Sequence, residues 1–215
     1  IVPPYFSVDY TVSSVDNLYD EEEQEYSGEI FSNTVLSYSV KDSVGDTLLL
    51  KNTFEVFTLA GDSIISLSRN YAINSFTGEH VPELGDQERT GYLFGKREIK
   101  EGEDFTYWHI NYNAPAQMQY VDTEEIHGVT VFKYFSDYEG EVIEQTAQLT
   151  HLPGVPEERR VLLEPELTLW IEPETVMLVS YKDETVAYYY DRETGEKLFP
   201  WNAFSNTLRD ESFSK

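Results

Sequence analysis

The sequence predicts a mainly β fold, a β-rich α+β chain with one or two curved antiparallel sheets and few short helices. Stretches rich in Tyr, Phe, Val and Ile recur at short, regular spacing, and turn residues separate them. Apolar residues almost never recur with the i, i+3, i+4 spacing of an amphipathic helix. Aromatic residues make up 14% of the chain, which suits strands whose rings lie half in a core.

The N-terminal half is expected to form four strands, at 5–12, 29–40, 47–59 and 63–73. An acidic loop at 16–25 separates the first two strands. Asp and Gly residues at 42–46 and at 61–62 mark the other turns, because these residue types favour turn conformations.

The C-terminal half is expected to continue the same sheet system. Hairpins are predicted at 118–140 with a turn at His127-Gly128, at 167–183 with a turn at Glu172-Pro173-Glu174-Thr175, and at 184–200. The stretch 142–150 is expected to extend the sheet.

Two segments depart from the strand pattern. The only plausible internal helix lies at 151–165, where Pro156 suits a first turn and Glu157 and Glu158 suit a helix N-terminus; a simple loop is the alternative. Residues 201–215 show a weak helical pattern. We predict a single β-rich domain at 1–200, followed by a stem at 201–215 that leads toward a membrane anchor.

The segments YAINSFTGEHV (71–81) and YYYDRETGEKL (188–198) carry the same device. In each, β-type residues lead to Asn74 or Asp191, whose side chain can bond the backbone two residues on. Gly78 or Gly195 then supplies the left-handed conformation that closes the hairpin. The offset of 195 − 78 = 117 residues is about half of the 215-residue chain, so two similar halves, at about 30–95 and 140–200, are a specific hypothesis.

The chain is strongly acidic, with 40 Asp and Glu against 15 Lys and Arg and a net charge of −25. Nucleic-acid binding requires clustered Lys and Arg and is therefore excluded as an expected function. An anionic membrane surface would repel the chain for the same reason. A solvated surface, of a kind that suits a salty habitat, explains the acids. Binding of cations or of a basic partner is the sharper alternative.

Cysteine is absent, so neither a disulfide framework nor thiol catalysis is available. No run of residues approaches the roughly 18 apolar residues of a membrane helix, and no signal peptide is visible. The chain starts abruptly at Ile1-Val2-Pro3-Pro4 without Met. We therefore expect a segment excised from a longer protein.

No motif for catalysis, metal binding or a cofactor is present. The four histidines stand alone, no two of them at metal-ligand spacing, and no calcium loop, nucleophile elbow or phosphate loop occurs. A carboxylate pair for glycoside chemistry stays open with 40 acids present. Tyr107, Trp108, Tyr112 and Trp201 could stack on sugars, and core aromatics are the alternative.

The order of motifs from residue 69 onward resembles the porin PorA family, a group of actinobacterial and archaeal envelope proteins of mostly unknown function. The resemblance as a whole covers roughly two thirds of the chain. It rests on five short stretches within that part: Arg69-Asn70-Tyr71 with the first Thr-Gly-Glu turn, Tyr92-Leu93-Phe94, Tyr107-Trp108, 124–134, and 170–175. Asn74-Ser75, Gly95 and Val176 depart from the pattern of the family, which indicates a distant branch.

The resemblance implies an extracytoplasmic, membrane-tethered β-rich domain at the cell surface, with anchors that lie outside this chain. We expect a non-enzymatic domain without metal or cofactor. It would bind a small molecule or lipid, as a sensor or carrier, at a pocket lined by Phe94, Tyr107, Trp108 and Trp170. A structural or interaction module of the envelope, acting through a protein partner or self-association, is the alternative. A hydrolase of an envelope polymer ranks third.

Overall fold

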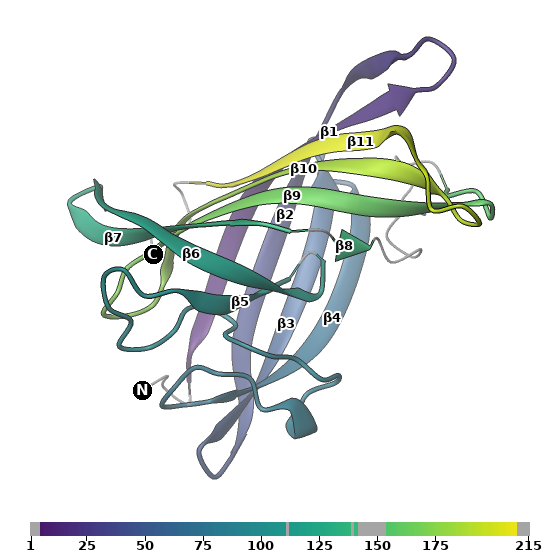
Figure 1. The fold of residues 1–215 in the computed structure, drawn as a ribbon. Helices are drawn as coiled ribbons and strands as arrows, with labels where there is room; N and C mark the ends of the chain where they lie inside the picture. The colour runs from purple at the N-terminus through teal and green to yellow at the C-terminus, as the bar shows by residue number, and fades with distance from the viewer. Residues whose placement is uncertain (1–4, 111, 139, 142–153, 210–215) are drawn as a thin grey trace.

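A computed structural model of the chain describes residues 5–110, 112–138, 140–141 and 154–209 (Figure 1). These residues form one curled, 11-stranded sheet in which every strand pair is antiparallel. The described residues contain no α-helix, and their single helical element is a 3₁₀ turn, η1 (Pro82–Leu84). The prediction of a mainly β fold with a curved antiparallel sheet is confirmed.

The strands follow one another as hairpins along most of the chain. The first four are β1 (Ser7–Asp20), β2 (Glu25–Val44), β3 (Thr47–Thr58) and β4 (Ser63–Asn74). The next four are β5 (Phe105–His109), β6 (Ala114–Ile126), β7 (Val129–Asp137) and β8 (Gly140–Glu141). The last three are β9 (Arg159–Ile171), β10 (Leu178–Asp191) and β11 (Lys197–Leu208).

The strand order is β4-β3-β2-β1-β11-β10-β9-β7-β6-β5, so the first and last strands pair in the middle of the sheet. The two outer strands, β4 and β5, are consecutive in the sequence. The segment 75–104 connects them and lies across the open side of the curl (Figure 1). Two isolated bridges, Ile73 with His80 and Tyr92 with Tyr107, tie this segment to β4 and β5, and a third, Glu79 with Tyr92, lies within the segment.

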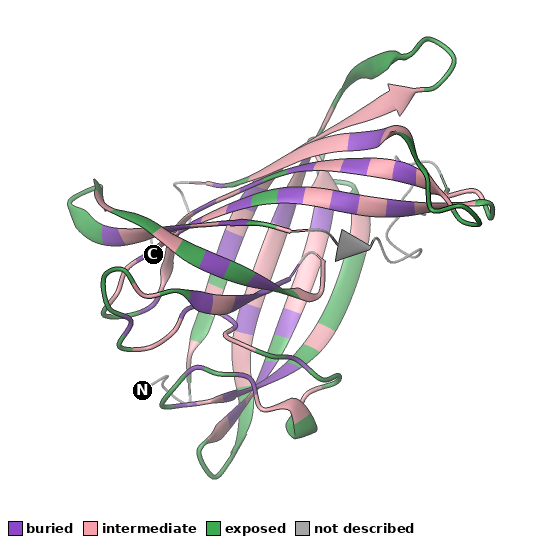
Figure 2. Ribbon diagram, in the orientation of Figure 1, coloured by how far each residue is buried: buried purple, intermediate pink, exposed green. Residues whose placement is uncertain are grey.

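Side chains alternate between two faces of the sheet, as Figure 2 shows for β9 and β10. We call the face that carries Tyr181 and Ala187 the inner face, because these side chains are buried, and the opposite face, with Lys182 and Val186, the outer face. The inner face holds the main core, in which Tyr71, Tyr134, Leu167 and Leu169 are almost wholly buried. Each such side chain contributes about 1.5–3 kcal/mol by burial.

Arg89 fixes the segment 75–104 against the core. Its guanidinium lies 4.1 Å from the centre of the Tyr71 ring and 2.6 Å from a carboxylate oxygen of Asp86, although only 2% of the residue is exposed. The cation is thus both paired and stacked, which a buried charge requires. This arrangement covers the core where the sheet itself is open.

The two Thr-Gly-Glu turns are built from the same hydrogen bonds. Asn74 Oδ1 accepts from the backbone N–H groups of residues 76 and 77 at 2.9 and 3.1 Å, and Asp191 Oδ1 accepts from those of 193 and 194 at 3.0 and 2.6 Å. Gly78 and Gly195 donate back at 2.8 and 2.9 Å, both with positive φ. The predicted turn geometry is confirmed.

The turn recurs at two further hairpins, so it does not mark a half-chain repeat. Glu172 accepts from residues 174 and 175 with Val176 at positive φ, and Asp20 accepts from residues 22 and 23 with Gln24 at positive φ. Beyond the turn the units differ, because β4 is followed by isolated bridges whereas β10 is followed by the full strand β11. The two predicted halves, at about 30–95 and 140–200, therefore share a turn and not a strand–turn–strand unit.

Both helical expectations are wrong where the structure describes them. Residues 159–165 belong to β9, where Val161, Leu163 and Pro165 alternate toward the inner face. Residues 201–208 are not a stem but the second part of β11, held between β1 and β10. In both cases pairing with two neighbouring strands outweighs a weak local pattern.

The predicted hairpins at His127-Gly128, at 172–175 and at 191–196 are confirmed. The acidic loop is shorter than the expected 16–25, because β1 continues to Asp20 and β2 starts at Glu25. The expected strand at 142–150 and the stem residues 210–215 lie outside the described residues. Within the described ranges, no helix has the length and apolar character needed to span a bilayer.

Candidate functional site

Three of the four residues predicted to line a pocket lie together in the core. Tyr107 and Trp108 of β5 are buried, with 6% and 5% of their surfaces exposed. Phe94 is half-buried and packs its ring against Phe6 and Tyr38, with centroids 5.6 and 5.2 Å apart. These side chains hold the segment 75–104 and β5 onto the sheet.

Trp170 stands apart from the other three, on the outer face of β9. Its Nε1 donates to Glu124 Oε2 at 2.8 Å, and the Lys133 ammonium, 2.9 Å from Glu124 Oε1, lies 5.3 Å from the ring centre. The four predicted residues are therefore divided between two faces of the sheet. Trp201, a candidate for stacking on sugars, is buried in a second inner cluster with Tyr189.

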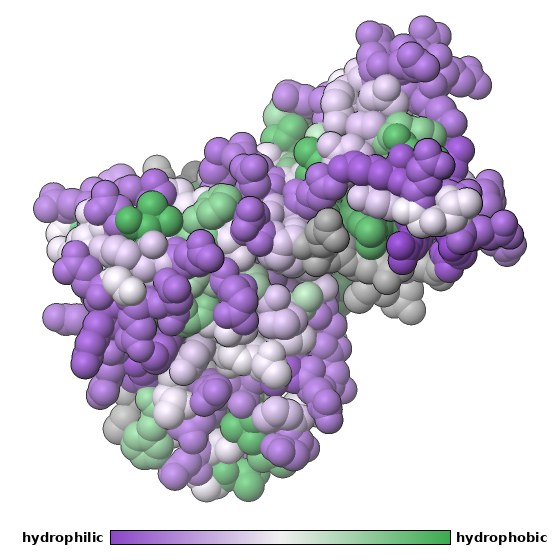
Figure 3. Space-filling model, in the orientation of Figure 1, coloured by the Kyte–Doolittle hydropathy of each residue, from purple (hydrophilic) through white to green (hydrophobic). Residues whose placement is uncertain are grey.

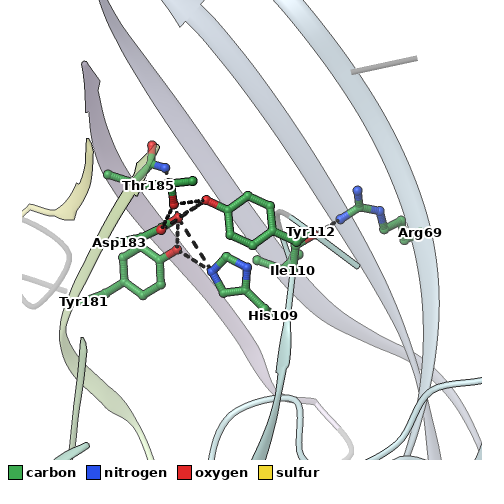
Figure 4. Close-up of polar contacts among 8 residues, drawn as sticks. Arg69, His109, Ile110, Tyr112, Tyr181, Asp183 and Thr185 are labelled. Carbon is green, nitrogen blue, oxygen red and sulfur yellow. Dashed lines mark hydrogen bonds and ion pairs between the residues drawn. The ribbon is translucent and has the colours of Figure 1, made fainter. Parts of the chain in front are cut away.

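A polar network lies buried on the inner face around Asp183 of β10 (Figure 4). Asp183 is 0% exposed. Its carboxylate accepts hydrogen bonds from the Tyr112 hydroxyl at 3.0 Å, the Tyr181 hydroxyl at 3.2 Å, the Thr185 hydroxyl at 2.8 Å and the Asn206 amide at 3.2 Å. Four neutral donors thus replace the water that a carboxylate loses on burial.

His109 completes the network from β5. Its Nε2 lies 2.9 Å from the Tyr181 hydroxyl and 3.7 Å from Asp183 Oδ2. Burial lowers the pKa of His109 to about 4, although the nearby Asp183 charge opposes that shift. Burial outweighs the Asp183 charge, because the ring is 0% exposed and the 3.7 Å separation from Asp183 is longer than a direct hydrogen bond. His109 is therefore neutral at pH 7.

The two phenols of this network, Tyr181 and Tyr112, determine where the protons lie. Burial, and next the Asp183 charge, raise the pKa values of Tyr181 and Tyr112 well above 10, so both phenols keep their protons. If Tyr181 donates to Asp183, the neutral His109 donates to Tyr181 through Nε2–H. Its Nδ1 then carries a lone pair that has no hydrogen-bond partner among the described residues. His109, Tyr181, Asp183 and Thr185 are buried, whereas Tyr112 and Asn206 are partly exposed. The network forms a polar layer between the two core clusters.

The outer face directly opposite this layer is hollowed. A hollow of ≈ 760 Å³ crosses strands from β2 to β7, and we call it the outer groove. Val15, Val186 and Ala203 give it an apolar floor, and five acids surround this floor: Glu29, Asp137, Glu164, Glu166 and Glu184. A volume of this size is in the range of about 300–1,000 Å³ that small-ligand sites occupy.

Three of these acids stand side by side on neighbouring strands. Asp137 of β7 is opposite Glu166 of β9, which is opposite Glu184 of β10. Like charges in this relationship destabilise a sheet. Glu184 has Lys182 at 2.6 Å, whereas Asp137 and Glu166 have no ion-pair partner in the part of the chain that the structure describes. A bound positive charge would relieve this repulsion.

The buried network positions the groove. Asp183 and Thr185 point inward from β10, and Glu184 and Val186 between and beside them point outward into the groove. On β11, Asn206 likewise points inward, and its neighbour Ser205 points outward into the groove. Because the inner side chains are hydrogen-bonded and packed, the outer side chains stand on fixed backbone, which is what a preformed site needs.

Neither the network nor the groove was predicted from the sequence. One usable signal existed for the network: in β10 the inward positions alternate as Tyr181, Asp183, Thr185, Ala187 and Tyr189, so two polar residues interrupt an otherwise apolar or aromatic series. The groove had no such signal, because its acids come from strands far apart in a chain that is acidic throughout.

The described residues hold no group of three or more His, Cys, Asp or Glu with the arrangement to bind a metal ion. No family model matches the chain, and no curated protein matches it. One similar solved structure comes from Bacteroides fragilis NCTC 9343 and is a protein provisionally assigned as exported, with a YmcC-like fold. The two share 12% identity with a TM-score of 0.37, over 93% of this chain and 95% of the other.

Proposed function

We propose that this chain is a non-enzymatic, extracytoplasmic binding domain of a membrane-tethered surface protein. Its site is the outer groove, and its ligand is a small molecule with an apolar body and at least one positive charge. The observation that carries the proposal is the groove itself, in which an apolar floor is surrounded by five carboxylates.

The groove suits such a ligand for two separate reasons. Val15, Val186 and Ala203 offer apolar surface whose removal from water favours binding by about 25 cal/mol per Å². Asp137 and Glu166, which have no ion-pair partner among the described residues, attract a cation and lose their mutual repulsion when a cation binds. An anionic ligand would be repelled by the same residues and by the net charge of −25.

The absence of a catalytic role is supported by where the reactive side chains lie. His109, Tyr181 and Asp183 form the clearest acid–base constellation among the described residues, and their exposed fractions are 0%, 5% and 0%. A general acid or base must come within hydrogen-bond reach of its substrate. The location at the cell surface rests on the sequence resemblance given above. The mostly hydrophilic face seen in Figure 3 is compatible with a domain exposed to water.

Isothermal titration with phenylbutylamine tests the proposal. The expected result is saturable binding with one site per chain. Phenylbutyrate, with the same apolar body and a negative charge, and spermine, with positive charges and no aromatic body, are expected to bind at least about tenfold more weakly, a difference of about 1.4 kcal/mol.

A matched pair of variants locates the site. Glu166→Gln with Glu184→Gln removes two acids from the groove, and Glu22→Gln with Glu23→Gln removes two from the exposed β1–β2 loop. The first variant is expected to weaken phenylbutylamine binding about tenfold, and the second to leave it unchanged. Absence of saturable binding, or equal effects of both variants, would contradict the proposal.

A further inference from the structure

The first half of β4 is a sheet edge that no described residue covers. β4 pairs with β3 on one side, and it forms an outer edge of the sheet in Figure 1. Its second half is covered on the other side by 79–86, through bonds such as Val81 N–H to Ala72 O at 2.9 Å and Asp86 N–H to Asn70 O at 3.1 Å. No such bond reaches the stretch 63–69 from any described residue, and much of it is exposed (Figure 2).

The second half of β4 shows which backbone groups of the first half point away from β3. Asn70, Ala72 and Asn74 use their outward N–H or C=O groups to bond 79–86. Backbone polar groups alternate sides along a strand, so Ser66 and Ser68 also point theirs outward. Between them, Leu67 is 46% exposed.

Apart from one irregularity at Ile64, where the pairing with β3 shifts by one residue, this edge lacks the protection that sheet edges normally carry as far as the described residues go. Charged residues, Pro, bulges or a covering segment prevent edges from pairing with other chains. The stretch 63–68 is SIISLS, without charge or Pro in a chain in which 26% of residues are charged. The free edge of β6 differs, because Asp122, Glu124 and Glu125 stand along it.

We propose that the edge 63–68 of β4 is an interaction surface that accepts one extended strand, and that the occupant is the same strand of a second copy of this chain. In antiparallel pairing centred on Leu67, Ser66 of each copy lies opposite Ser68 of the other copy. These two residues then exchange backbone hydrogen bonds. The two Leu67 side chains would then be a non-hydrogen-bonded pair, whose Cα atoms are about 4.5 Å apart and whose side chains are in contact.

A second copy fits this edge better than a partner of opposite charge. The seam 63–68 contains no acid, so a basic strand finds nothing there to recognise, and two uncharged copies meet without like charges in contact. The exposed Leu67 gains an apolar partner only from a strand with an apolar residue at the same position. The remaining surfaces repel each other through the net charge of −25, a repulsion that salt screens.

Cross-linking tests the register. The chain contains no Cys, so Leu67→Cys introduces a single thiol, and the expected Cα separation of about 4.5 Å is within the disulfide range. Oxidation is expected to give a covalent dimer of 2 × 24.9 = 49.8 kDa. Val121→Cys, 52% exposed on the acidic free edge of β6, is the control and is expected to remain monomeric.

Sedimentation of two serine variants tests the hydrogen bonds. In about 1 M salt, where the Debye length is about 3 Å, the wild-type chain is expected to show a dimer that grows with concentration. Ser66→Pro removes one outward N–H without touching the β3 ladder and is expected to be monomeric, whereas Ser66→Ala keeps the backbone and is expected to dimerise.

Three results would overturn the proposal. They are a wild-type chain that stays monomeric across the concentration series, a Ser66→Pro variant with a native circular-dichroism spectrum that dimerises as the wild type does, and Leu67→Cys chains that cross-link no faster than Val121→Cys chains. The last comparison does not depend on how well the proline variant folds.

Discussion

Val176 occupies, in the turn between β9 and β10, the same left-handed position that Gly195 occupies in the turn between β10 and β11. Their φ angles are 56° and 71°, and in both turns the residue donates its N–H to the acceptor four positions back. A β-branched residue in this conformation is strained by about 1–2 kcal/mol. Val176 tolerates it because the residue packs into the core, next to Ile171 and Gly95, with only 6% of its surface exposed.

We therefore expect Val176→Gly to destabilise the fold by about 1 kcal/mol although it relieves the strain, because burial of a Val side chain contributes about 1.5–3 kcal/mol. Gly195→Val, at a position with open surroundings, adds strain without burial and is expected to cost about 1–2 kcal/mol. Urea unfolding measures both. A more stable Val176→Gly variant would show that the side chain contributes less than the strain.

Asp183 is expected to be the most sensitive position of the buried network. Asp183→Leu leaves the donors of Tyr112, Tyr181, Thr185 and Asn206 without their acceptor, and loss of one partner of a buried polar group is costly. The expected destabilisation is about 3–5 kcal/mol. Asp183→Asn keeps an acceptor oxygen and should cost about 1–3 kcal/mol.

Glu184→Leu is the matched control for Asp183→Leu, because the neighbouring side chain points to the outer face and is exposed. Its expected effect in urea unfolding is within about 0.5 kcal/mol. Similar losses for Asp183→Leu and Glu184→Leu would mean that the inner network contributes little.

His109 is expected to make the fold less stable in mild acid. Its pKa is about 4 when folded and 6.5 when unfolded, so between these values the unfolded chain binds a proton that the folded chain does not. Stability is therefore complete above pH 6.5 and falls as the pH falls toward 4, by up to roughly 3 kcal/mol. His80, with a pKa also lowered to about 4 by burial, titrates in the same window.

His109→Phe removes one of these two protons, so the part of the slope of unfolding free energy against pH that the two histidines cause between 6.5 and 4 should fall by about half. The quantity to measure is the difference between variant and wild type, because protonation of surface acids also reduces the repulsion among the 40 acidic residues. An unchanged slope would show that His109 is charged in the folded state.

Gly91 is expected to be irreplaceable for a steric reason. A Cβ atom there would lie 2.4 Å from the carbonyl oxygen of Thr106 in β5, and φ is +70°. Gly91→Ala must therefore displace the segment that closes the curl, with an expected cost above about 3 kcal/mol. At Gly128, φ is +78° and a Cβ atom would have nothing within 4 Å. Gly128→Ala therefore measures the cost of the backbone conformation alone, which should be about 1 kcal/mol. Thermal unfolding of both variants separates the two effects.

The strands and their turns were predictable because their signals are local. Alternation and turn chemistry are present in the sequence of each hairpin, as at Asp191 to Gly195, where one carboxylate and one glycine define the loop. The segment at 201–208 was mistaken for a stem because its strand character comes from pairing with β1 at positions such as Phe204 and Asp16, which are remote in sequence.

The candidate site depended on such remote pairings almost entirely. Phe94, Tyr107 and Trp108 were predicted as pocket residues from their type, and the structure uses them to pack the segment 75–104 onto the sheet. The row of Asp137, Glu166 and Glu184 exists only because three strands meet in one register. Nothing in the local sequence distinguishes these acids from the other acids of the chain.

The sequence by itself determined that this chain is a β-rich, acidic, cysteine-free domain with several hairpins, since composition and short-range pattern suffice for those properties. Tertiary structure decided the rest: which face of each strand is inner, how the first and last strands pair, where the groove forms and which edge of the sheet stays open. These properties arise from hydrogen-bond register between strands, and a shift of one residue in register would turn every side chain of a strand to the opposite face.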